Sequence, residues 1–339
     1  MSTTMKPGDQ ARTVLWYPLR FEPIYQYRLW GGRRLRDLLT APLPGDGPIG
    51  EAWVLSDRAD HASRVADGPL EGRTLGELLE LYPEVMLGQL AGRYPRFPLL
   101  LKFLDVHELL SLQVHPADDR RDLLPDGETG KTEAWVVLEA GTRSRIYAGL
   151  KPGTTIDDLR RAVASGVVAD NVASFVPKQG DGVLVPAGTV HSLGDVVVFE
   201  IQENSDVTFR LDDWGHVDPK TGRPRALQVD QALSAIDVSQ GAVAPVSPTV
   251  EETTPVKREL IFDCEHFRLW RLRGRSPFDV GAPGTPRVLV CLEGTGTVEH
   301  GGKAYAAGRG DVLLLPAALG VCVFRPSGPV TLLEAALPQ

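Results

Sequence analysis

The sequence predicts a mainly β protein built from two β-barrels with a few inserted helices. Short apolar or alternating runs, separated by Gly and Pro turns, occur along much of the 339-residue chain and dominate its C-terminal part. A weak internal repeat indicates that the two barrels are related. The string from Gly180 to His191 returns from Gly310 to Val321, with valine in place of the histidine.

The bulk composition is typical of a globular protein that buries a large core, with 42% hydrophobic and 24% charged residues. The repeat and the runs of strands predict the division of the chain. We expect a disordered tail over residues 1–13, a first barrel with helical insertions over 14–239, a linker over 240–256 and a degenerate second barrel over 257–339.

Charge and cysteine usage restrict the classes of partner. The net charge of -8 argues against a nucleic-acid partner, which needs a clustered basic surface, but a local cationic pocket for a small anion remains compatible with it. Three scattered cysteines predict no disulfide framework. No apolar run approaches the roughly 18 residues of a membrane span. We expect a cytoplasmic protein without membrane contact, whose oligomeric state the sequence leaves open.

Each element of the first barrel is predicted from a local pattern. Apolar runs beside Pro and Gly predict strands at Val14–Arg20, Ile49–Asp57 and Pro98–Asp105. The Gly-Gly pair in Trp30–Gly32 predicts a turn. Leucines at helical spacing predict a helix over Thr74–Arg93. Thr74 is a suitable N-cap for this helix, because Glu77 follows three residues later and can complete a capping box.

The second part of this barrel follows the same rules. A charged loop over 117–129 precedes a strand at Val136–Ala148 and a helix at Thr155–Val168. Further elements are expected as a strand from Gly180, a strand at Val196–Gln202, a turn at 203–206, a strand at 207–214 and a helix at Gln228–Ile236. Residues 240–256 fit either a linker or an extended edge strand.

Polar side chains recur two residues apart in LSLQVHP (Leu110–Pro116) and GKTEAW (Gly130–Trp135), where a strand directs them to one face. His191 follows a Pro-x-Gly turn in GDGVLVPAGTVHSLG. Together these strings offer two imidazoles, one carboxylate and one amide oxygen, from Gln113, His115, Glu133 and His191. A divalent metal such as zinc takes such ligands and keeps a position open for substrate.

Two charged residues lie within otherwise apolar strands. Lys102 costs several kcal/mol if it is buried and unpaired, so it either extends to solvent or faces a polar cavity. Glu51 shares a strand face with Trp53, and either faces the same cavity or belongs to a network of polar residues at its rim. Glu200 and Arg210 likewise fall on polar faces of their strands.

The string Gly-x5-Pro-x-Gly-x2-His is similar to the second signature of the cupin superfamily of metal-binding jelly-roll barrels. With LSLQVHP and GKTEAW upstream and EIQENSDVTFRLDDWG downstream, residues 14–236 resemble the type I mannose-6-phosphate isomerases (phosphomannose isomerases) in their short bacterial form. The resemblance implies two cupin-type barrels and an intramolecular oxidoreductase that interconverts mannose 6-phosphate and fructose 6-phosphate with one zinc ion per chain.

The resemblance also implies roles for individual residues. The metal ligands fall on Gln113, His115, Glu133 and His191, with Gln113 not a direct ligand in some short members. The essential arginine falls on Arg210, and the cavity residues fall on Glu51, Lys102, Ser111, Lys131 and Glu200. Many members have a basic residue after the Asp-Trp-Gly string, where this chain has His216. We therefore expect a weaker or pH-dependent phosphate contact from His216.

A hypothesis for the mechanism follows from the chemistry of an aldose–ketose isomerase, which moves a proton between C2 and C1. A cis-enediol or enediolate needs the least charge reorganisation, and zinc can stabilise its developing charge. Lys131 and Glu200 are candidates for the proton carrier, because a neighbouring cation can lower a lysine pKa and burial can raise a carboxyl pKa. Arg210 would hold the phosphate or stabilise the enediolate oxygen.

Alternatives remain at each level. One alternative is that Glu200 only orients His191 or another metal ligand. Another is that Arg210 forms a salt bridge with Asp212 or Asp213. The barrel would instead isomerise a free sugar or another phosphosugar, or bind sugar without catalysis. Three cationic side chains, Lys102, Lys131 and Arg210, favour a phosphosugar.

Overall fold

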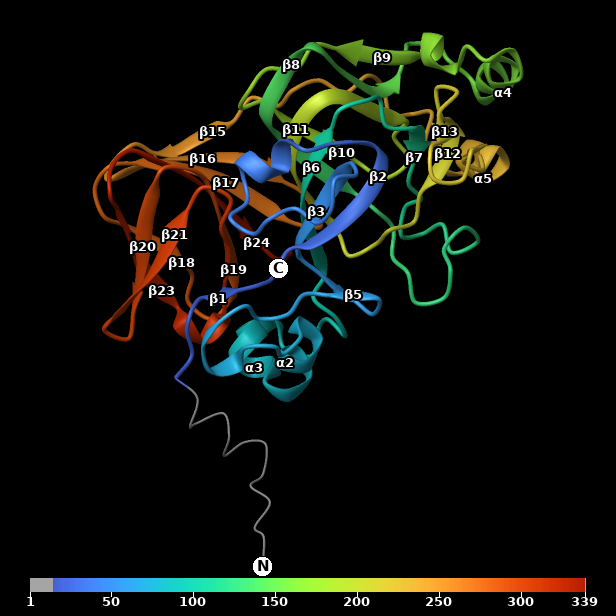
Figure 1. Ribbon diagram of the computed structural model, residues 1–339. Coiled ribbons are helices and arrows are strands. Elements are labelled where there is room, and N and C mark those ends of the chain that lie inside the picture. Colours follow the sequence, from blue (N-terminus) through green and yellow to red (C-terminus); the bar gives the residue numbers. More distant parts are fainter. Residues whose placement is uncertain (1–14, 339) are drawn as a thin grey trace, which may run out of the picture.

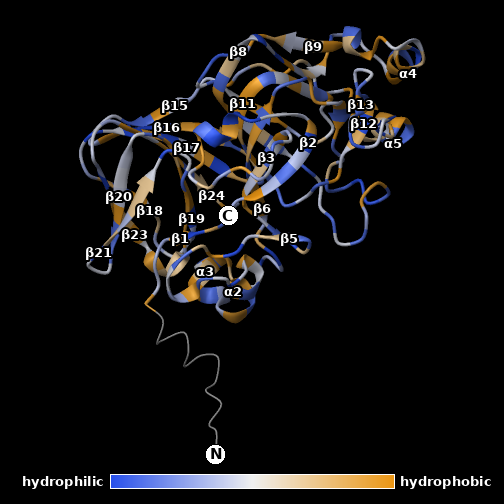
Figure 2. Cartoon of the chain, viewed as in Figure 1, coloured by the Kyte–Doolittle hydropathy of each residue, from blue (hydrophilic) through white to orange (hydrophobic). Residues whose placement is uncertain are grey.

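The computed structural model of the chain describes residues 15–338, so the predicted tail over 1–13 lies outside the described residues. The protein is mainly β, as predicted, and its strands form two units that lie side by side (Figure 1). Figure 2 shows hydrophobic residues concentrated on the strands of both units, whereas the connecting loops are largely hydrophilic.

The first unit is a curved nine-stranded sheet. Its central path follows the order β10 (Gly182–Val185), β8 (Glu133–Leu150), β11 (His191–Glu203), β6 (Leu99–Val106), β2 (Ile24–Gly32) and β3 (Ile49–Leu55). Three shorter strands complete it: β9 (Val172–Phe175) pairs with β8, while β7 (Leu112–Val114) pairs with both β11 and β12 (Phe209–Asp212). The ladder β12, β7, β11 and β6 therefore places residues from distant parts of the chain next to one another.

The second unit contains a seven-stranded and a four-stranded sheet. The larger sheet has the order β1 (Leu19–Arg20), β22 (Val312–Leu315), β19 (Arg287–Glu293), β24 (Val330–Ala336), β17 (Arg268–Gly274), β16 (Val256–Asp263) and β15 (Thr249–Glu252). The smaller has the order β18 (Phe278–Gly281), β23 (Val321–Pro326), β20 (Thr295–His300) and β21 (Lys303–Gly308). The larger sheet thus includes β1, which belongs to the predicted first barrel, and β15, which belongs to the predicted linker over 240–256. The predicted boundaries at 239 and 257 stay a prediction.

Two hairpins and four α-helices lie outside these sheets. The hairpins are β4 (Asp57–Arg58) with β5 (His61–Ala62) and β13 (Val217–Asp218) with β14 (Arg223–Pro224). The helices among the described residues are α2 (Leu75–Leu81), α3 (Pro83–Leu87), α4 (Ile156–Ser165) and α5 (Val229–Ala235). None of them has the length and apolar character that a helix needs to cross a membrane.

The helix predicted over Thr74–Arg93 is wrong in its extent. Thr74 caps α2 through the predicted capping box with Glu77, but α2 ends at Leu81 and α3 begins at Pro83. Proline lacks the N–H that an uninterrupted helix would need at this point, so the chain restarts with Pro83 at the first helical position. The helix predicted from Thr155 is confirmed as α4, with Thr155 in a capping box.

The turn predicted at Trp30–Gly32 is also wrong, because these residues end the strand β2. Gly31 pairs with Val106 of β6, and a Cβ at Gly31 would lie 2.4 Å from the backbone nitrogen of Gly50. The glycine thus permits close contact between strands instead of forming a turn. The strand predicted over Val14–Arg20 is confirmed only at Leu19–Arg20, and Val14 lies outside the described residues.

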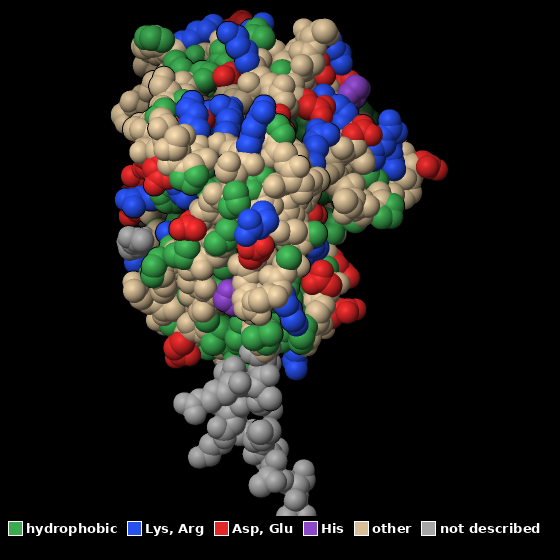
Figure 3. Space-filling model, turned by 90° about the vertical axis from the view of Figure 1, so that its left-hand side faces the viewer, with side chains coloured by type: hydrophobic (Ala, Val, Ile, Leu, Met, Phe, Trp, Pro, Cys, Tyr) green, Lys and Arg blue, Asp and Glu red, His purple; other side chains and the backbone are tan. Residues whose placement is uncertain are grey.

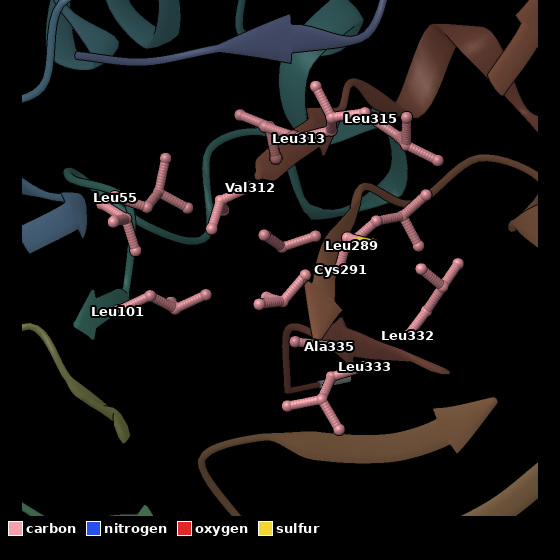
Figure 4. Packing of buried hydrophobic residues seen from close by; sticks show 14 of the residues in the cluster. Leu55, Leu101, Leu289, Cys291, Val312, Leu313, Leu315, Leu332, Leu333 and Ala335 are labelled. Carbon is pink, nitrogen blue, oxygen red and sulfur yellow. The ribbon is translucent and has the colours of Figure 1, made fainter. Parts of the chain in front are cut away.

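Alternation along β6 divides its side chains between two environments. Leu99, Leu101 and Phe103 belong to a hydrophobic cluster that also contains residues of the second unit, whereas Leu104 packs in a separate cluster inside the first unit. Figure 4 shows Leu55 and Leu101 beside side chains of β19, β22 and β24. The two units therefore share one core, which fixes the back of the sheet that carries the polar residues.

The outer surface of the second unit carries both charge signs. Figure 3 shows basic side chains in a row on this face, with acidic side chains scattered around them. The three cysteines, Cys264, Cys291 and Cys322, are all free, as their scattered positions predicted.

Candidate active site

Strand register brings the predicted site residues together. His191 of β11 lies opposite Gln113 of β7, and Gln113 in turn lies opposite Arg210 of β12. Further along the same edge of β11, Glu200 lies opposite Lys102 of β6, while β8 pairs with the other edge. Since side chains of directly opposed residues share one face of a sheet, these residues project into the same interior.

His115, Glu133 and His191 form a buried cluster whose potential ligand atoms all lie within 4.8 Å of one another. Glu133 Oε1 lies 3.2 Å from His191 Nε2, and Glu133 Oε2 lies 3.5 Å from His115 Nε2. Glu133 Oε2 is buried and accepts no hydrogen bond of regular geometry, although Lys131 Nζ lies 2.8 Å from it. Two imidazoles and a carboxylate facing one point are a fitting donor set for a divalent metal.

Hydrogen bonds fix the tautomer of both histidines. The Nδ1 atom of His115 lies 2.8 Å from the Val207 carbonyl, and that of His191 lies 2.9 Å from the Thr189 carbonyl. A proton on each Nδ1 leaves the Nε2 lone pair free for a metal. Burial lowers the pKa of His115 to about 3 and also lowers the pKa of His191, so both rings are neutral at pH 7, as metal binding requires.

Gln113 lies beside this cluster. Its Nε2 is 3.3 Å from His191 Nε2, and its Oε1 accepts a hydrogen bond from the Ser111 hydroxyl at 3.0 Å. A half-turn of the amide would direct Oε1 at the cluster, and the Ser111 hydroxyl could then accept from Nε2. Gln113 is therefore placed to serve as a fourth ligand or as a neighbour of the ligands.

Lys131 is the cation nearest to the candidate ligands. Its Nζ lies 2.8 Å from Glu133 Oε2 and 3.2 Å from His115 Nε2. Burial opposes the charge of this lysine, but the carboxylates of Glu133 and Glu200 outweigh burial and raise the pKa of Lys131. The predicted lowering of this pKa depends on a neighbouring metal cation and stays a prediction.

A cavity of about 530 Å³ opens above these residues. Eight of the predicted site residues line it: Glu51, Lys102, Ser111, Gln113, Lys131, Glu133, Glu200 and Arg210. His115 and His191 are fully enclosed next to it, at 1% and 0% exposure. His216 is not among the described residues that line the cavity, and its ring lies 3.8 Å from Asp213.

Ion pairs neutralise most cations of the cavity. Arg28 binds Glu51 through two hydrogen bonds of 2.8 and 3.1 Å. Lys102 Nζ lies 3.1 Å from Glu200 Oε2 and 5.1 Å from the centre of the Trp53 ring. Lys102 therefore faces the cavity and does not extend to solvent, and Glu51 is likewise buried in the cavity wall.

Arg210 differs from the other cavity cations, because it makes no ion pair within 4.0 Å to any residue in 15–338. The proposed salt bridge with Asp213 is wrong, since Asp213 pairs with Arg225. Asp212 accepts a hydrogen bond from the Trp214 backbone instead. Burial, with the nearby charge of Arg225, lowers the pKa of Arg210. A guanidinium without an ion-pair partner in a cavity can bind an anion.

Two of the carboxyls that line the cavity, those of Glu51 and Glu200, have opposite pKa shifts. Burial alone would raise the pKa of Glu51, but the charges of Arg28 and Lys102 and the hydrogen bonds from Arg28 and Trp53 together lower that pKa to about 2. Burial raises the pKa of Glu200, although the charge of Lys102 opposes the rise. Glu200 accepts a hydrogen bond from Trp135 Nε1 at 2.9 Å. It does not orient His191, whose Nδ1 is held by Thr189.

Sequence reasoning missed several residues of the cavity wall, namely Tyr27, Arg28, Asp206, Thr208, Asp218 and Arg225. Tyr27 and Arg28 lie on β2, which was not predicted as a strand and whose last residues, Trp30–Gly32, were predicted as a turn. The alternation of IYQYRLW in that strand was the signal that could have found them. Arg225 lies on the loop after the β13–β14 hairpin, where no local pattern marks a cavity residue.

Comparison with known proteins agrees with this arrangement. Residues 19–131 match the family model "Phosphomannose isomerase type I, catalytic domain". "Probable mannose-6-phosphate isomerase GmuF" of Bacillus subtilis is 32% identical over 325 residues, which is 92% of this chain and 99% of that protein. "Mannose-6-phosphate isomerase ManA" of the same organism is 33% identical, covering 89% of this chain and 94% of that protein.

Comparison with solved structures agrees with the comparison of sequences. The crystal structure of the mannose 6-phosphate isomerase from Bacillus subtilis superposes with a TM-score of 0.87 at 29% sequence identity, covering 95% of this chain and all of that chain. A curated relative from Streptococcus mutans is 32% identical over 303 residues. Sequence, fold and the buried histidine–carboxylate cluster agree, and the chain belongs to the type I mannose-6-phosphate isomerase family.

Proposed function

We propose that the protein is a zinc-dependent aldose–ketose isomerase that interconverts mannose 6-phosphate and fructose 6-phosphate through a cis-enediol. The main support for this proposal is a buried cluster of two histidines and one carboxylate that adjoins the cavity. Arg210 lines the same cavity and has no ion-pair partner among the described residues. The names of the relatives supply the substrate. The cluster supports a metal, and the unpaired arginine supports a phosphorylated sugar.

His115, Glu133 and His191 would hold the zinc ion, with Gln113 as the fourth ligand or its neighbour. Zinc, when bound, supplies a Lewis acid that stabilises negative charge on substrate oxygens. The backbone carbonyls of Val207 and Thr189 keep both imidazoles in the ligating tautomer. Three donors of this type favour zinc over magnesium or calcium, which prefer oxygen ligands.

Arg210 would bind the phosphate of the substrate. Its guanidinium offers paired N–H donors to phosphate oxygens, and its buried Nε has no hydrogen-bond partner in the structure. Arg225 lines the same cavity and adds positive charge there, although Asp213 partly neutralises it. In this reading Arg225 takes the part that the resemblance gives to a basic residue at position 216, because His216 does not line the cavity.

Lys131 and Glu200 remain the two candidates for moving the proton between C2 and C1. The base takes the C2 proton while O1 gains a proton, which gives the enediol. The same group then returns a proton to C1 as O2 gives up its hydroxyl proton, so one proton also passes from O2 to O1. Glu200 is buried with a raised pKa, which suits a carboxyl that accepts and returns a proton. Lys131 lies closer to the metal ligands, at 2.8 Å from Glu133. Glu200→Gln and Lys131→Met, tested for exchange of the C2 proton with solvent, would separate the two.

One assay tests the proposed reaction. Zinc-supplemented protein is offered mannose 6-phosphate, and fructose 6-phosphate is measured. Free mannose and a second phosphosugar are offered in parallel. Faster turnover of free mannose would favour the free-sugar isomerase, and binding without turnover would favour a non-catalytic sugar-binding barrel. We also place the enzyme in the cytoplasm, since a reducing compartment suits its three free cysteines.

A further inference from the structure

The backbone on either side of Lys131 is held by two acidic side chains. Gly130 N–H donates to Asp118 Oδ1 at 2.8 Å, and Thr132 N–H donates to Glu203 Oε2 at 2.7 Å. The Thr132 carbonyl also accepts a bond of 3.1 Å from the Glu203 backbone. Lys131, between them, is 4% exposed. These two acids therefore hold the backbone on either side of Lys131, whose own N–H donates to the Pro116 carbonyl at 3.1 Å.

His266, from the second unit, completes this cluster. It lies in the turn between β16 and β17, and its Nδ1 is 3.3 Å from Glu203 Oε1. Polar atoms of Asp118, Glu203 and His266 all lie within 4.8 Å of one another. One residue of the second unit thus touches the acid that holds the segment bearing Lys131.

The protonation of Glu203 and its contacts give the imidazole of His266 a role in this cluster. Burial raises the pKa of Glu203 to about 8, and the charge of Asp118 adds to the rise. A pKa near 8 leaves Glu203 mostly protonated at neutral pH, so it does not act as a second charge beside Asp118, but the carboxyl can rotate away from Thr132 unless its other oxygen also has a partner. An imidazole on the far side of Glu203 offers it a partner and opposes that rotation.

We propose that His266 is a positioning residue for the active site: by contacting Glu203 it keeps Thr132, and therefore Lys131, in place. The second unit, which provides none of the candidate metal ligands, would then support the reaction through this one contact. The inference rests on the proposed function, because it assigns the benefit to turnover of the sugar phosphate.

The test compares three full-length variants loaded with zinc. His266→Ala removes the contact. His266→Asn keeps a polar atom near the position of Nδ1. Arg268→Gln is the matched control, because Arg268 lies at the start of β17 and pairs with Asp263 where both side chains are 48% exposed. Each variant is measured for kcat, KM, zinc content, melting temperature and hydrogen exchange of the backbone at 130–133.

We expect His266→Ala to lower kcat by about tenfold to a hundredfold with little change in KM, since small displacements of catalytic groups have effects of this size. Exchange at 130–133 should rise, zinc should stay at one per chain, and His266→Asn should restore most of kcat. Arg268→Gln should match the wild type.

Several results would overturn the inference. One is an unchanged kcat in His266→Ala, and another is a loss no greater than that of Arg268→Gln. A loss of kcat that is explained by lost zinc, or by a melting temperature below the assay temperature, would also overturn it. Failure of the proposed function has a different signature: the wild type would not convert mannose 6-phosphate, while exchange at 130–133 would still report on the contact.

Discussion

Lys102 and Glu200 are directly opposed on β6 and β11, and Lys102 Nζ lies 3.1 Å from Glu200 Oε2 with both residues 3% exposed. This pair lies in the cavity wall beside Trp53 and Trp135, whose rings contact the lysine and the carboxylate respectively. A buried ion pair has a large cost when one partner is removed, because the other charge is left in a medium of low polarity. The pair therefore couples stability to the chemistry of the cavity.

The first prediction concerns this pair. Lys102→Met should lower the free energy of unfolding by about 3–5 kcal/mol, because it leaves Glu200 without its cation. Lys102→Met combined with Glu200→Gln should be more stable than the sum of the two single effects predicts. Urea denaturation measures both, with Arg160→Met as control, since Arg160 pairs with Asp157 on the surface. Strictly additive effects would contradict the coupling.

The second prediction concerns the metal. Exhaustive chelation should abolish isomerase activity, and added zinc should restore it. His115→Ala and His191→Ala should each reduce bound zinc by at least about tenfold, because each removes one ligand from a three-residue cluster. Metal analysis by mass spectrometry measures the content. Full activity of the chelated protein would exclude a metal-dependent reaction.

The third prediction concerns Arg210. Arg210→Ala should lower kcat/KM for mannose 6-phosphate by about a hundredfold or more, corresponding to the loss of a charge-assisted contact of a few kcal/mol. Zinc content should be unchanged, because Arg210 does not contact the histidine–carboxylate cluster. Arg210→Lys should recover only part of the activity, since lysine cannot bind phosphate bidentately. Equal loss of zinc in Arg210→Ala would show a structural role instead.

The fourth prediction is a pH dependence from Glu51. Its folded-state pKa of about 2 lies below its ordinary value of 4.5, because the charges of Arg28 and Lys102 and the hydrogen bonds to Glu51 together outweigh burial. A depressed carboxyl pKa stabilises the folded state above the ordinary pKa, and the contribution is lost as pH falls from about 4.5 towards 2. The wild type should lose about 3 kcal/mol more than Glu51→Gln over that window. Parallel unfolding free energies for both proteins would contradict this.

The fifth prediction concerns the shared core. Leu101→Ala should lower the free energy of unfolding by about 2–5 kcal/mol, because Leu101 is 0% exposed between the two units (Figure 4). Thermal unfolding should remain a single transition, since both units contribute to that core. Leu81→Ala is the control, because Leu81 is 39% exposed. Two separate transitions would show that the units fold independently.

The sequence by itself determined the class of fold and predicted most of the residues that meet at the cavity. Alternation within LSLQVHP and GKTEAW was enough to place Gln113 with His115 and Lys131 with Glu133, because a strand directs every second side chain to one face. The isolated charge of Lys102 in an apolar strand likewise indicated a polar cavity. These features are local, so they can be read from neighbouring residues.

Only the tertiary structure decided which distant residues meet. Strand register places Arg210 opposite Gln113. Asp213 forms its ion pair with Arg225, so the guanidinium of Arg210 remains available to an anion. Strand register also brings His266 of the second unit to Glu203. Such pairings depend on how strands far apart in sequence align, and local pattern does not specify this alignment. The same limit explains why a turn was predicted at Gly31, whose small size serves contact with Gly50.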